Sequence, residues 1–111
     1  MSAEFIDGAL CFIGMFTVIC VRNGEMIYFT RDEYEYQLKK AREYVEKAGI
    51  LVGQYGITGI GVGLVDRRIG LVVFVVSKKF EQEALSQIRR IVPPDIPVKV
   101  KVAVFRALRS E

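Results

Sequence analysis

Residues that could carry chemistry are few in this 111-residue chain, which contains no histidine and two cysteines. Without an imidazole, the Ser/His and Cys/His catalytic pairs are excluded, and zinc and copper sites lose their commonest ligand. Cys11 and Cys20 stand in an apolar segment without CxxC or Cys/His spacing, which predicts buried free thiols that pack as small hydrophobes. We therefore expect a protein that is not an enzyme, with no catalytic residue, cofactor or metal.

A second candidate for chemistry is the glycine series in the segment 56–65, GITGIGVGLV. A dinucleotide fingerprint needs GxGxxG between a strand and the start of a helix, where amides and the helix dipole meet the phosphates. Here the glycines precede another apolar run, and no Gly-Lys-Ser/Thr follows. The pattern therefore argues against a phosphate loop and indicates strand glycines, which often mark close approach of another group.

Basic residues offer an alternative function, because phosphate contacts need little more than positive charge. The RNA-recognition motif on sheets needs several exposed aromatic side chains, and residues 68–75 hold only the ring of Phe74. Any nucleic acid would then be bound through charge and shape. The residues predicted for such contacts are Arg67, Arg68, Lys78, Lys79, Lys99 and Lys101.

Charge is unevenly spread along the chain, whose net charge is +3. Residues 1–35 hold two basic and six acidic side chains, and residues 36–111 hold fourteen and seven. This asymmetry suits a basic surface for an anionic partner or contacts between copies of the chain, although solvated helix faces would also produce it. Few cysteines and mixed charge favour the cytoplasm. The scarcity of Asn and the absence of His and Trp hint at a heat-adapted source.

The N-terminal third is dominated by Leu10–Val21, an apolar run without charges. It is shorter than the ~20 residues that cross a bilayer, and acidic residues precede it, unlike a signal peptide. We interpret it as a buried strand over residues 9–21, bulged or broken at Gly14. Asn23-Gly24 then predicts a tight hairpin, with a returning strand over residues 25–29.

Two helices and three further strands follow. Thr30 and Glu33 form a capping box, which predicts a helix over residues 31–48 ended by a left-handed Gly49. The segment 56–77 predicts a hairpin of two strands that are apolar on both faces and therefore buried on both sides. A second helix after Ser77 stops before two prolines, and residues 97–105 alternate valine with lysine as a last strand.

The expected fold is a single α+β domain over residues 1–111, with an N-terminal hairpin (1–29) and a split βαβ core (30–106). The element order βαββαβ over about residues 25–106 resembles the ferredoxin-like superfold. That resemblance implies a two-layer sandwich preceded by an extra strand or hairpin. It implies no activity, because such superfolds host many unrelated functions.

In that arrangement both helices lie on one side of the sheet, so the other side stays exposed. An apolar patch of this size exceeds what soluble monomers usually expose, which predicts a homo-oligomer, with a two-fold dimer favoured. We expect a non-enzymatic module that serves assembly or regulation, not a membrane protein. A ligand sensor at a dimer interface rests on fold analogy alone. The predicted self-association face comprises Gly59, Gly61, Gly63, Val72, Phe74 and Val76.

Overall fold

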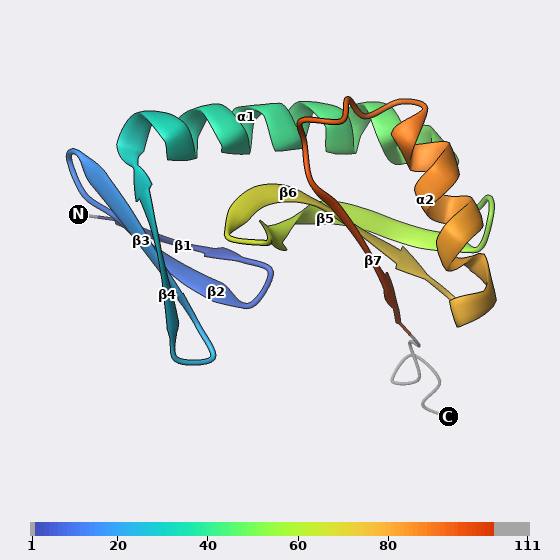
Figure 1. The fold of residues 1–111 in the computed structure, drawn as a ribbon, viewed down its shortest axis with the longest axis horizontal. Helices are drawn as coiled ribbons and strands as arrows, with labels where there is room; N and C mark the ends of the chain where they lie inside the picture. The colour runs from blue at the N-terminus through green and yellow to red at the C-terminus, as the bar shows by residue number, and fades with distance from the viewer. Residues whose placement is uncertain (1, 104–111) are drawn as a thin grey trace.

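A computed structural model describes residues 2–103 as an α+β fold with two sheets and two α-helices (Figure 1). The N-terminal sheet has the order β1-β2-β3-β4, and the C-terminal sheet has the order β5-β6-β7. The elements along the chain are β1 (Ser2–Ile6), β2 (Ala9–Ile13), β3 (Thr17–Arg22), β4 (Glu25–Thr30), α1 (Arg31–Ala48), η1 (Gly49–Leu51), β5 (Ile57–Val65), β6 (Arg68–Val75), η2 (Lys78–Phe80), α2 (Glu81–Arg89) and β7 (Val98–Val102).

The N-terminal sheet is an antiparallel meander joined by tight turns. At Asn23-Gly24 both residues have positive φ, 52° and 80°, as a type I′ hairpin requires. The hairpin predicted there is confirmed, with Arg22 paired to Glu25. Asp7-Gly8 makes an equivalent turn between β1 and β2, with φ of 50° and 79°.

The single strand predicted over residues 9–21 is in fact two strands, β2 and β3. They pair with each other across a turn at residues 14–16, in which the Gly14 amide donates to the Thr17 carbonyl at 2.9 Å. The reversal lets each half of the apolar run pair with the other. Together with β1, which was not predicted from the sequence, it raises this sheet from the expected two strands to four. The interruption expected at Gly14 is therefore a complete change of direction.

Helix α1 occupies the predicted residues. The Thr30 hydroxyl accepts from the Glu33 amide, the Glu33 carboxylate accepts from the Thr30 amide, and both bonds are 3.1 Å. The predicted left-handed cap at Gly49 is wrong, because Gly49 has φ −57°. The chain instead continues into η1, which carries the buried Leu51 into the core.

The C-terminal sheet contains the predicted central hairpin. Asp66 and Arg67 both have positive φ and turn β5 into β6. After η2 and α2 the chain returns as β7, parallel to β6. The strand predicted over residues 97–105 is described from Val98 to Val102, and its last two residues lie outside the described part of the chain.

The α+β class holds, but the ferredoxin-like topology is not confirmed. That topology would place residues 25–30 in the same sheet as the central hairpin. Here they form β4, which pairs with β3 in the other sheet, and β7 lies beside β6 instead. The tight Asn23-Gly24 turn pairs β4 with β3, and β4 is not paired with a strand of the C-terminal sheet.

One helix joins the two sheets. Helix α1 contacts β3 and β4 as well as β5 and β6, and Figure 1 shows it running across both layers, with α2 at its far end. Buried side chains from both sheets, including the fully buried Cys11 and Leu71, belong to one hydrophobic cluster. The two sheets therefore share a core on the α1 side.

Candidate interaction surfaces

The inner face of the N-terminal sheet carries a disulfide between Cys11 and Cys20. The two residues lie directly opposite each other on β2 and β3, with Cα atoms 3.9 Å apart, and neither is exposed. The prediction of free thiols is wrong because residues 9–21 form two paired strands, which bring the cysteines together. The disulfide also weakens the cytoplasmic prediction, since structural disulfides are rare in that compartment.

A partly buried hydrogen bond connects strand β1 to α1. The Tyr34 hydroxyl donates to Glu4 Oε1 at 2.7 Å. Burial, and secondarily the nearby Glu4 carboxylate, raise the pKa of Tyr34 well above its usual range. The phenol therefore stays protonated as a donor, and the contact stabilises the edge of the sheet without offering a proton for catalysis.

The outer face of the N-terminal sheet is entirely without charged side chains. Because side chains alternate along each strand, the pairing of β1 to β4 arranges this face in two cross-strand rows. Phe5 is 77% exposed, and the rings of Phe12 and Tyr28 are also exposed. The rows are Phe5, Leu10, Val21 and Met26, and beside them Ala3, Phe12, Ile19 and Tyr28.

The turn that joins β2 to β3 adds two more apolar side chains to this end of the molecule. Met15 is 76% exposed and Phe16 is 78% exposed. Large exposed apolar surfaces on a small protein usually mark a site of interaction. Sequence reasoning missed this surface because residues 9–21 were interpreted as one strand buried on both sides; the aromatic residues at positions 5, 12 and 28 were the available signal.

The predicted self-association face lies on the side of the C-terminal sheet opposite α1, and it is divided. Val72 is only 1% exposed and Gly63 is buried. A Cβ atom at Gly63 would collide with Val72 and would lie 2.9 Å from Asp7 Oδ2. The β1–β2 turn therefore covers this end of the sheet.

The other end of that face stays open. Val76 is 48% exposed, and Phe74 and Gly59 are half-buried. A Cβ atom at Gly59 would lie 3.9 Å from the Phe74 ring, whereas one at Gly61 would meet nothing within 4 Å. The Phe74 ring thus packs beside Gly59 and leaves Gly61 uncovered.

Ion pairs of Asp7 hold the β1–β2 turn against the C-terminal sheet. Its carboxylate lies 3.1 Å from Arg22 Nη1 and 3.5 Å from Lys101 Nζ, and its side chain is only 13% exposed. Arg22 also donates to the Asp7 carbonyl at 3.3 Å. One partly buried carboxylate thus connects the β1–β2 turn to β3 and to β7 in the other sheet.

The six basic residues predicted to contact nucleic acid are not gathered at one site. Arg67 pairs with Glu25 at 3.1 Å, and Arg68 donates to the Asp95 carbonyl at 2.7 Å. Lys78 and Lys79 follow the opposite end of β6, and eight strand residues span about 26 Å. Lys99 and Lys101 point from β7 toward the Asp7 cluster. Arg67 and Lys99 do line one hollow, together with the acidic side chains of Glu25 and Asp66. The structure therefore brings only part of the predicted set together, at a place where acidic side chains partly neutralise it.

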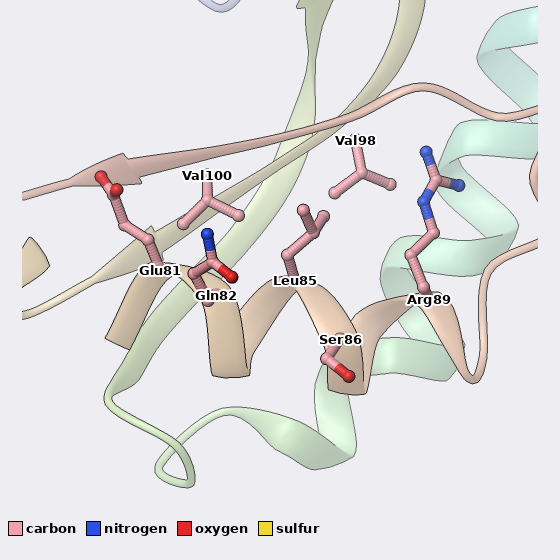
Figure 2. Close-up of a pocket in the computed structure, with 7 residues that line it drawn as sticks. All are labelled: Glu81, Gln82, Leu85, Ser86, Arg89, Val98 and Val100. Carbon is pink, nitrogen blue, oxygen red and sulfur yellow. The ribbon is translucent and has the colours of Figure 1, made fainter. Parts of the chain in front are cut away.

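A groove of about 590 Å³ lies between α2 and β7 (Figure 2). Leu85, which is 39% exposed, faces the half-buried Val98 and Val100 across it. Glu81 lies toward one end and Arg89 toward the other. Arg89 is already occupied by the carbonyls of Pro93 and Ile96, at 2.9 and 2.8 Å. The groove thus has an apolar strip formed by Leu85 and the two valines, bordered on α2 by the polar side chains of Gln82 and Ser86.

Across residues 2–103, no group of three or more Cys, Asp or Glu side chains is placed to hold a metal ion. None of the helices in this part of the chain is long and apolar enough to cross a membrane. Comparison of the chain with family models, with curated proteins and with solved structures finds no match.

Proposed function

We propose that this protein is a self-associating, non-enzymatic α+β module that assembles through the outer face of its N-terminal sheet. The proposal is carried by one observation: two adjacent cross-strand rows of uncharged, mostly apolar side chains face solvent. Such a module serves assembly or regulation by presenting its other surfaces in a fixed two-fold arrangement.

The size of the surface supports this proposal. An aromatic side chain can bury about 150–250 Å², so the exposed parts of the three outer-face rings amount to about 250–450 Å². The aliphatic members of the two rows, together with Met15 and Phe16 at the adjoining turn, enlarge the apolar area further. The total approaches the roughly 800 Å² per partner that a stable interface buries.

A second copy is the occupant that fits this face best. Two sheets stack face to face about 10 Å apart, so a copy related by a two-fold axis would cover the same rows on both subunits. A membrane surface fits less well, because membrane-surface elements usually combine apolar residues with Lys or Arg. The strand residues of the outer face include no Lys and no Arg.

The test is the mass in solution at micromolar concentration, measured by light scattering for three matched proteins. We expect a dimer for the unchanged protein, a monomer for Phe12→Asp, and a dimer for Tyr36→Asp, which alters an exposed ring of α1 outside the outer face. Circular dichroism verifies that each variant is folded. Phe74→Asp probes the half-buried end of the C-terminal sheet face in the same way and should also stay dimeric.

An unchanged protein that is monomeric, or a Phe12→Asp variant that stays dimeric, would overturn the proposal. A monomer that sediments with phosphatidylcholine vesicles, and loses this in Phe12→Asp, would identify a membrane as the occupant instead. Added mass with single-stranded RNA or DNA at low salt, lost when Arg67 and Arg68 are made neutral, would favour the nucleic-acid alternative.

A further inference from the structure

Strand β7 has one free edge. It is paired with β6 alone among the described strands. The Leu71 amide donates to the Pro97 carbonyl, and the Ala103 amide donates to the Val75 carbonyl. In a parallel ladder, alternate residues bond to the same neighbour, so Lys99 and Lys101 also face β6. The backbone amides and carbonyls of Val98, Val100 and Val102, which alternate with the lysines, therefore face outward.

The side chains of Val98 and Val100 line the groove between α2 and β7. Val98 and Val100 point toward Leu85 of α2 (Figure 2). From Glu81 to Arg89 the helix is about 12 Å long at 1.5 Å per residue, which matches three to four residues of extended chain. An added strand beside β7 would thus place apolar side chains in this groove while its backbone pairs with the outward-facing amides and carbonyls.

The opposite face of β7 is basic. Lys99 is exposed and has no ion pair within residues 2–103, and Lys101 shares the Asp7 carboxylate with Arg22. A lysine ammonium has three donors, and the 3.5 Å contact to Asp7 is longer than a strong charge-assisted bond. Both lysines can therefore interact with acidic side chains on a neighbouring strand.

The same charges disfavour pairing between two copies of β7. The sequence of β7, VKVKV, reads the same in both directions. Antiparallel two-fold pairing centred on Val100 would place Lys99 opposite the second copy's lysine at position 101. Like charges directly opposite each other destabilise a sheet, and lysine on an edge strand is a known protection against such pairing.

We propose that the free edge of β7 and the groove beside α2 bind an extended peptide segment in which apolar and acidic residues alternate. The segment adds a strand to the C-terminal sheet. Its apolar side chains pack between Leu85 and the valines, and its carboxylates lie opposite Lys99 and Lys101. This site is separate from the outer face of the N-terminal sheet and does not depend on self-association.

The test uses a fluorescently labelled peptide, acetyl-Gly-Val-Glu-Val-Glu-Val-Gly-amide, with the Lys-for-Glu peptide as its charge-reversed control. Fluorescence anisotropy should show binding of the Glu peptide that is weakened by salt, and at least roughly fivefold weaker binding of the Lys peptide. Lys99→Glu should weaken the Glu peptide roughly three- to tenfold and strengthen the Lys peptide. This reversal cannot arise from a variant that is merely unfolded.

A second variant tests the backbone contribution. Val100→Pro removes an amide that faces the free edge, and proline is tolerated at such edge positions. We expect it to weaken the Glu peptide at least roughly fivefold while the circular dichroism spectrum stays unchanged. Phe12→Asp, which tests self-association, should bind the peptide as the unchanged protein does.

Four results would overturn the inference. The first is equal binding of the Glu and Lys peptides, or binding of neither at millimolar concentration. The second is a Lys99→Glu variant with unchanged preference. The third is a folded Val100→Pro variant with unchanged affinity. The fourth is loss of peptide binding in Phe12→Asp, which would place the site on the outer face instead of on β7.

Discussion

Reducing the Cys11–Cys20 disulfide should lower the free energy of unfolding by about 2.6 kcal/mol. This magnitude follows from the loop-closure entropy of a cross-link that spans nine residues in the unfolded chain. The native state loses little in comparison, because β2 and β3 remain paired and free thiols are well accommodated in an apolar core. The change acts mainly on the unfolded state.

Urea unfolding with and without a reducing agent measures this difference. With a slope of about 1–3 kcal/mol per molar urea for a domain of this size, the midpoint should fall by about 1–2.5 M on reduction. The Cys11→Ala/Cys20→Ala double variant should show no response to the reducing agent and serves as the matched control. Equal midpoints in both conditions, or two thiols that react in the denatured but unreduced protein, would refute the reasoning.

Three further perturbations have definite expected outcomes. Tyr34→Phe should cost about 1.5–3 kcal/mol, because it leaves the Glu4 carboxylate without its donor. Because the pKa of Tyr34 is raised in the folded state, the stability that the protonated Tyr34 contributes should be retained up to about pH 10 and lost progressively above it. Urea titrations at pH 8 and 11 should therefore show a smaller decrease in the free energy of unfolding for Tyr34→Phe than for the unchanged protein. Gly63→Ala should cost about 1–3 kcal/mol in thermal melts, because the added methyl group would collide with Val72 and crowd Asp7 of the β1–β2 turn, whereas Gly61→Ala, with open space around it, should be neutral or stabilising in the same melts. Thr30→Ala should cost about 1 kcal/mol through loss of the helix N-cap, and an unchanged urea midpoint would contradict that role.

Local patterns predicted the parts of the fold that depend on neighbouring residues. The capping box at Thr30 and the apolar periodicity after it placed α1 at its observed residues. Asn23-Gly24 and the segment around Asp66 placed two hairpins. In each case the signal comes from backbone sterics and side-chain alternation within a few residues, so no distant contact can easily override it.

The same reasoning failed where two conformations were locally equivalent. The apolar pattern of residues 9–21 is compatible with one long buried strand or with two paired strands, and the turn at Gly14 has no strong turn sequence such as Asn-Gly. Because residues 9–21 were interpreted as one strand, neither the Cys11–Cys20 disulfide nor the exposed face that includes Phe12 was predicted. The prediction of a left-handed cap at Gly49 was wrong for a related reason, because burial of Leu51 favours continuing the helical turn over ending it at Gly49.

The sequence by itself determined most of the helical and strand segments, with β1 and the division of residues 9–21 as the exceptions, and it determined that the sheets would be rich in apolar side chains on both faces. Only the tertiary structure decided which of those faces meets solvent. The β1–β2 turn covers Val72 through the contacts of Asp7 with Arg22 and Lys101, whereas the outer face of the N-terminal sheet stays open. Those contacts join residues 15 to 94 positions apart, and pairing at such distances depends on how whole elements pack, which periodicity along the chain does not encode.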